Sequence, residues 1–336
     1  MKDAKDAKVL VELGGVEFDY EALSDNGDHK TYKVATAGRL FSMVGDQKPL
    51  IRPGGVLTGL EVTPDDAEVN NTVDINAGTA WINGALVTLA AATEGLAVRG
   101  TAPNIFKIDS ITLTDAAAIA VVEGTGSTEF SEVRGAAGGP PLIPVTSIEL
   151  AQVRMTTEAA AAIKASEIFK VPNQHRELAS YPTYVVQPVG EAPYAGTARV
   201  VFSEALPLIH TGPLTKTVYA RYTNPNFVTL PECSEIKLPR DTFSQTEEKT
   251  YDGPRAAVSL GRGSGGFSCL HDGTGTALIM QVKGTQRFLK FFPDKYLTGY
   301  WICLATLAIA DEYPAGGSMK AAVSLGSQAE PEWIQP

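Results

Sequence analysis

The sequence is poor in the residues from which covalent cross-links and metal centres are built. It has three widely spaced cysteines and no CxxC pair, so neither a disulfide framework nor a zinc site is predicted, and Cys233, Cys269 and Cys303 are interpreted as small buried apolar residues. Its four histidines stand far apart, in no HExxH or HxH setting, and are interpreted as surface or linker residues: His29, His175, His210 and His271. We therefore expect no metal.

Long apolar runs are also absent. No stretch approaches the length needed to span a bilayer, so no membrane insertion is expected. The first residues, MKDAKDAK, alternate basic and acidic side chains and lack the order of a signal peptide. These features predict a protein made and folded in a cytoplasm.

Catalytic motifs are equally scarce. No serine lies in a GxSxG elbow, and the glycine-rich segment 261–266 lacks the GK[ST] ending of a phosphate loop, so a flexible hairpin loop is predicted there. Adjacent carboxylates occur at 65–66, 247–248 and 311–312, but neighbours on a strand point to opposite faces and cannot converge. The protein is predicted not to be an enzyme and to need no cofactor. A glycan or cell-wall hydrolase stays open as an alternative, because scattered carboxylates on a β-rich fold are compatible with one.

The charge is negative and unevenly placed. The net charge is −10, with 15 Lys/Arg against 25 Asp/Glu in residues 1–195 and 13 against 13 in residues 196–336. An acidic surface repels nucleic acid, so tight DNA binding is not expected.

What the sequence does contain is a succession of short β-type runs separated by Gly, Pro, Asn and Asp, which predicts a mainly β fold with two domains. In the first part, strands are predicted at 9–13, 72–78, 79–89, 106–113, 118–124 and 148–155. Asn83-Gly84 predicts a hairpin turn, because both residues accept positive φ. In the second part, strands are predicted at 198–202, 216–223, 234–239, 255–261, 287–292, 300–310 and 319–326.

Two segments have helical character. The alanine-rich run 156–169, with Thr156 or Thr157 as cap, predicts a helix. Residues 272–283 could begin with Asp272 or Thr274 as N-cap and form a short helix, or equally form a strand. The proline-rich stretch 171–196 is interpreted as a linker between a domain at 1–170 and one at 197–336. The aromatic segment 288–301 suits a core or a subunit contact better than a ligand platform.

Residues 227–268, FVTLPECSEIKLPRDTFSQTEEKTYDGPRAAVSLGRGSGGFS, followed by 287–333, resemble the major tail tube protein of siphoviruses. The resemblance lies in the order of features over about 196–336: Ile236-Lys237-Leu238-Pro239, a Thr-rich polar segment, a glycine-rich loop, a short helix candidate, the FFPD strand, and two last strands joined by Pro314-Ala315-Gly316-Gly317. Residues 51–89, with AGTAWINGALV, and 138–155, with IPVTSIELAQV, are similar to small β-domains of phage baseplate and tail-fibre proteins.

This resemblance implies a C-terminal β-sandwich or barrel with one short helix, and an N-terminal β-domain that decorates the tube or contacts a neighbouring subunit. A long hairpin from each subunit would join those of its neighbours into a barrel, in hexameric rings that stack into a filament. The polar segment 241–252 and the acidic N-terminal tail are the candidate flexible assembly loops, with an ordinary solvent loop as the alternative. The twelve residues of that segment are Asp241, Thr242, Phe243, Ser244, Gln245, Thr246, Glu247, Glu248, Lys249, Thr250, Tyr251 and Asp252.

The expected function is a structural virion protein of a long-tailed bacteriophage, assembled in the bacterial cytoplasm. Its partners would be itself, the tape measure protein, the tail-tip or baseplate proteins and the tail terminator, while genomic DNA passes through the lumen without specific binding. A baseplate, tail-tip or receptor-binding component is the alternative.

Overall fold

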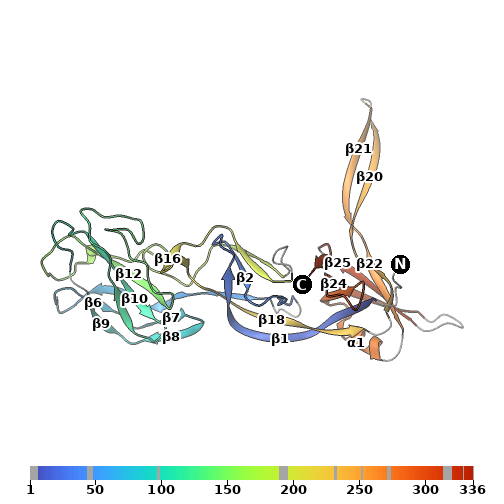
Figure 1. Cartoon of the computed structure of the whole chain (residues 1–336), viewed down its shortest axis with the longest axis horizontal. Coiled ribbons are helices and arrows are strands. Elements are labelled where there is room, and N and C mark those ends of the chain that lie inside the picture. The colour runs from blue at the N-terminus through green and yellow to red at the C-terminus, as the bar shows by residue number, and fades with distance from the viewer. Residues whose placement is uncertain are drawn as a thin grey trace.

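The computed structural model describes the chain at residues 7–43, 48–96, 99–188, 196–230, 233–250, 253–270, 274–312, 320–327 and 329–335. The fold is mainly β with several sheets, as the sequence predicts. The molecule is elongated, with a β-rich lobe at each end and a hairpin standing away from one of them (Figure 1).

A long antiparallel ladder runs through the largest sheet. Strand β1 (Lys8–Asp25) pairs with β18 (Val218–Leu230) from Val9↔Leu230 to Ala22↔Tyr219, with two register shifts. Besides β18, strand β1 pairs with β23 near its start and with β2 near its end. The ladder therefore connects two groups of strands within one sheet.

A buried carboxylate fixes β1 to its surroundings. Glu12 is fully buried and accepts hydrogen bonds from the Ser42 hydroxyl and from the Phe288 backbone N–H, the latter at 3.1 Å. Burial raises the pKa of Glu12, while these two donors favour its charged form.

The lobe that contains both chain ends extends the sheet beyond β1 in the order β23, β24, β25, β22, β19. The bounds are Gln286–Phe292 for β23, Tyr300–Glu312 for β24, Lys320–Ser327 for β25, Gly265–Leu270 for β22 and Cys233–Lys237 for β19, with β26 (Glu332–Ile334) on β24. The segment that the sequence left open between helix and strand is helix α1 (Thr274–Val282), whose Ile279 and Val282 are buried against this sheet. Asp272 and residues 314–317 lie outside the described residues.

On the other side of the ladder the sheet continues through smaller strands. β2 (Thr31–Val34) pairs with β15 (Arg199–Phe202), β15 with β14 (Tyr184–Gln187), and β3 (Leu50–Pro53) with β18. Their core is aromatic, with Tyr32 against Phe202 and Phe41 against Tyr222 in edge-to-face contacts.

The second lobe packs three small sheets around one apolar core built from residues between Val56 and Ile168. Its strands are β4 (Gly55–Gly59), β5 (Val62–Pro64), β6 (Thr72–Ile75), β7 (Gly78–Ile82), β8 (Ala85–Leu89), β9 (Ala92–Gly95), β10 (Lys107–Thr114), β11 (Ile119–Val122), β12 (Ser147–Met155) and β13 (Ile168–Phe169). A short pair, β16 (Leu208–His210) and β17 (Leu214–Thr215), lies beside it.

The predicted helix at 156–169 is wrong. The segment has bends, a single 3₁₀ turn at Ala165–Glu167, and strand β13. Its backbone is held by tertiary partners instead: the Asn71 N–H donates to the Ala161 carbonyl at 3.0 Å, and the Arg99 guanidinium donates to the same carbonyl at 2.9 Å. Burial of Ile163 and Ile168 in the lobe core outweighs the helix propensity of the alanines.

The stretch 171–196, predicted to be a linker, contains residues that are paired in a sheet or buried. That stretch holds strand β14 and the buried residues His175 and Glu177. In addition, β1, β2 and β3 of the predicted first domain pair with β15, β18 and β23 of the predicted second. The chain therefore returns to its first strands after completing the lobe of residues 56–168.

The predicted Asn83-Gly84 turn is confirmed. It joins β7 to β8 with positive φ at both residues, 48° and 77°. A Cβ added at Gly84 would lie 3.3 Å from the Tyr219 ring.

We therefore expect Gly84→Ala to lower the free energy of unfolding by about 1–2 kcal/mol, because an L side chain disfavours this backbone region and Tyr219 is close. Gly95→Ala, in open space on β9, should change it by less than about 0.5 kcal/mol. Urea unfolding of both variants measures the difference, and equal midpoints would contradict the turn's role.

Candidate functional site

The predicted assembly segment forms a strand, not a loop. Residues 241–250 make up β20 (Asp241–Thr250), which pairs antiparallel with β21 (Gly253–Arg262) from Asp241↔Arg262 to Thr250↔Gly253. Tyr251 and Asp252 lie outside the described residues. The loop prediction fails because the polar segment finds a full-length partner in the strand predicted at 255–261. The hairpin projects away from the lobe that carries it (Figure 1).

The hairpin register pairs uncharged residues over the half nearer its base. Phe243 pairs with Leu260 and Gln245 with Val258, and the intervening pairs join Ser244 to Ser259 and Thr246 to Ala257. The five pairs from Thr242↔Gly261 to Thr246↔Ala257 contain no charge.

The two edges of this hairpin have no further strand. β20 and β21 form a sheet of their own, and within the described part of the chain neither pairs with another element. Each strand therefore leaves a row of outward N–H and C=O groups available for pairing.

The base of the hairpin is anchored to the lobe. The Asp241 N–H donates to Glu330 at 2.9 Å, and the Arg240 guanidinium lies 4.7 Å from the centre of the Trp301 ring. Trp301 in turn contacts Trp333 edge to face. This agrees with the packing role predicted for the aromatic segment, in which Phe288 and Tyr300 are also buried.

Segment 261–266 is neither a phosphate loop nor the predicted hairpin loop. It carries the chain from β21 into β22, and the Gly263 N–H donates to the Arg240 carbonyl at 2.9 Å. A Cβ at Gly263 would overlap that carbonyl, so the crossing of the two chain segments requires glycine.

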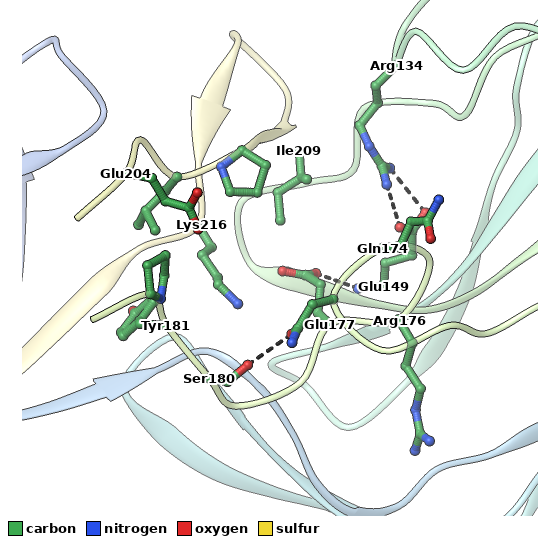
Figure 2. A pocket seen from close by; sticks show the side chains of 14 residues that line it. Arg134, Glu149, Gln174, Arg176, Glu177, Ser180, Tyr181, Glu204, Ile209 and Lys216 are labelled. Carbon is green, nitrogen blue, oxygen red and sulfur yellow. Dashed lines mark hydrogen bonds and ion pairs between the residues drawn. The ribbon is translucent and has the colours of Figure 1, made fainter. Parts of the chain in front are cut away.

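A separate cavity of about 350 Å³ lies beside the lobe of residues 56–168, between β12, the segment 173–182 and the segment 204–216 (Figure 2). Charged residues line it. Arg134 donates to Glu149 at 3.1 Å, and the Glu149 N–H donates to Oε2 of Glu177 at 2.6 Å. Lys216 approaches from the opposite side, with its Nζ 3.3 Å from the Leu178 carbonyl.

Glu177 has an oxygen without a partner. Its side chain is 7% exposed, and Oε1 accepts no hydrogen bond from the described residues. Burial raises the pKa of Glu177 to about 7, although the charge of Lys216 opposes this shift. Burial also lowers the pKa of Lys216. The cavity thus holds an acid and a base whose charges are both disfavoured by desolvation.

The three described histidines contact different partners. The His29 Nδ1 lies 2.6 Å from Asp25, His175 is buried near Arg154, and His210 contacts the Pro144 carbonyl, while His271 lies outside the described residues. In the part of the chain that is described, no three His, Cys, Asp or Glu residues are grouped for a metal ion. Helices there include none that is long and apolar enough to cross a bilayer.

Comparisons with known proteins identify no relative: no family model matches the chain, and no curated protein matches it.

No pattern in the sequence indicates the cavity between Glu177 and Lys216. Glu177 stands in the stretch interpreted as a linker, and Lys216 begins a predicted strand. Neither position carries a periodic or motif signal, since their proximity depends on the return of the chain to its first strands.

The raised pKa of Glu177 gives a testable pH dependence. A carboxyl whose folded pKa exceeds its unfolded value contributes stability below about pH 4.5, and this is lost as the pH rises through about 7. Relative to Glu177→Gln, the wild type should lose about 3 kcal/mol of unfolding free energy between these limits. Denaturant titrations across this pH range measure it, with Glu204→Gln, an exposed carboxyl at the same cavity, as control. Parallel profiles for wild type and Glu177→Gln would contradict the assignment.

Proposed function

We propose that the protein is a structural subunit that assembles with copies of itself through hairpin β20–β21, as the tail tube subunit of a long-tailed bacteriophage does. The two open edges of the hairpin carry this proposal. The resemblance of residues 196–336 to tail tube proteins is the reason for proposing one kind of assembly, in which rings stack around a lumen.

Hairpin β20–β21 is a two-stranded sheet of its own. A two-stranded ladder of ten residues a side is marginally stable alone in water, and its outer edges invite pairing. Pairing with the hairpins of neighbouring copies supplies a third and a fourth strand. A closed ring of hairpins removes every free edge, which is the solution that barrels use.

The distribution of charge supports edge pairing at the lower half of the hairpin. Natural edges are often protected by charged residues and proline, and here Glu247, Glu248, Lys249, Pro254 and Arg255 all stand towards the tip. The uncharged pairs nearer the base lack such protection. That half is therefore where strands of neighbouring copies would meet.

The expected partners follow from the same proposal. Copies of the chain make the ring and stacking contacts, the tape measure protein lies within the tube, and tail-tip and terminator proteins close its ends. The tube-like part, residues 196–336, has 13 Lys/Arg against 13 Asp/Glu and so offers DNA no net attraction, as a conduit requires.

Electron microscopy of the concentrated protein in negative stain tests this function. The wild type should form hollow tubes with a regular axial repeat. Ser244→Lys should abolish them, because ring closure brings the added charges of neighbouring copies together, whereas within one hairpin Ser244 is opposite the uncharged Ser259. Leu86→Lys, at an exposed position on β8, is the matched control and should still assemble. A wild type that stays monomeric at high concentration would contradict the proposal.

A second candidate is a baseplate, tail-tip or receptor-binding component. The cavity at Glu177 favours it, because a buried carboxylate oxygen without a partner suits a ligand that donates a hydrogen bond. Discrete rings or trimers in place of tubes would favour this second function.

A further inference from the structure

Two cysteines face each other on the two strands that flank the hairpin in the chain. Cys233 on β19 and Cys269 on β22 are direct antiparallel partners, at the end of the β19–β22 ladder farther from the hairpin, and their sulfur atoms are 2.8 Å apart. Neither is joined in a disulfide in the structure. The third cysteine, Cys303, lies on β24 in register with Leu289 and contacts Ser327.

The backbone already meets the requirements of a disulfide. Directly opposed residues of an antiparallel pair have Cα atoms about 4.5–5.5 Å apart. Disulfides join cysteines whose Cα atoms are about 4.4–6.8 Å apart, with a sulfur–sulfur bond of about 2.05 Å. Closing the remaining gap between the Cys233 and Cys269 sulfurs needs side-chain rotation and no rearrangement of the strands.

We propose that Cys233 and Cys269 form an oxidation site whose product is an intrachain disulfide between β19 and β22, the strands that flank hairpin β20–β21. The co-reactant is a small-molecule disulfide such as oxidised glutathione. This inference does not rest on the proposed assembly, because it requires only the folded single chain.

The two thiols have different roles in the reaction. Cys233 is half-buried whereas Cys269 is 1% exposed, so the Cys233 thiolate attacks glutathione disulfide and displaces one glutathione thiolate, which takes up a proton. The thiolate of Cys269 then attacks the Cys233 sulfur of the mixed disulfide and displaces the second glutathione. Two protein thiols and one glutathione disulfide become one protein disulfide and two glutathione molecules.

The position of the bond gives it a structural consequence. Cys233 precedes the hairpin and Cys269 follows it, 36 residues later in the chain. β19 is also the outermost strand of its sheet, with β22 as its neighbour. The disulfide would therefore tie the edge strand that leads into the hairpin to the strand that follows it, so that β19 cannot separate from β22.

Thiol counting and mass spectrometry of the purified full chain test the site. After incubation with oxidised glutathione and denaturation, the titratable thiols should fall from three to one, and the intact chain should be lighter by two hydrogen atoms. A peptide map should join the Cys233 and Cys269 peptides. The rate should rise with pH, because the neighbouring Cys269 thiol and burial raise the pKa of Cys233 and the thiolate is the reactive form.

Matched serine variants complete the test. Cys303→Ser should still lose two thiols, whereas Cys233→Ser should keep both of its remaining thiols. The wild-type mass change is independent of whether any variant folds. Three thiols remaining after oxidation, a lasting mixed disulfide with glutathione, or only chain-to-chain cross-links would each overturn the proposal.

Discussion

The β1–β18 ladder is the constraint on which the rest of the molecule depends. Strands of 18 and 13 residues are two to three times the usual length. Both belong to one sheet, in which β23 pairs with the start of β1, β2 with its end and β3 with β18. The chain leaves this ladder after β3, builds the lobe of residues 56–168 from separate sheets, and returns to the ladder through β15 and β18. The Glu177–Lys216 cavity lies where this return crosses the lobe, and its buried charges are a consequence of that route.

The opposite end of the same sheet bears the hairpin. The chain goes from β18 through edge strand β19 into β20 and comes back from β21 into β22, so the hairpin leaves and rejoins the sheet at neighbouring strands. Its base is anchored by Arg240 on Trp301 and by the close crossing at Gly263, while its two ladder edges are open. A firmly held base and open edges are what an element needs in order to pair with copies of itself in a defined direction. The opposed thiols of Cys233 and Cys269 lie on the two strands that flank the hairpin, at the end of their ladder farther from it.

Local patterns in the sequence predict local structure here and little beyond it. The Asn83-Gly84 turn and most strands follow from residues close in the chain, and both are found as predicted. The helix at 156–169 is not, because Ile163 and Ile168 are buried by a core whose other members lie up to about a hundred residues away. The cavity and the thiol pair cannot be predicted from local patterns either, because they form between residues far apart in the chain. Glu177 lies near Lys216, and Cys233 near Cys269, only after distant strands have paired. Segment 241–252 is marked as unusual by its polarity, but its strand geometry depends on the partner strand that follows it.

On assembly, the open edges of β20–β21 are expected to pair with those of neighbouring copies. Amide hydrogen exchange, measured on dilute and on concentrated protein, tests this directly, because outward N–H groups on an open edge exchange quickly and paired ones do not. The outward amides between residues 242 and 246 and between 257 and 261 should exchange rapidly in dilute protein and become protected on concentration, while those of the β1–β18 ladder stay protected throughout. Equal exchange of the hairpin at both concentrations, in a sample that has assembled, would contradict it.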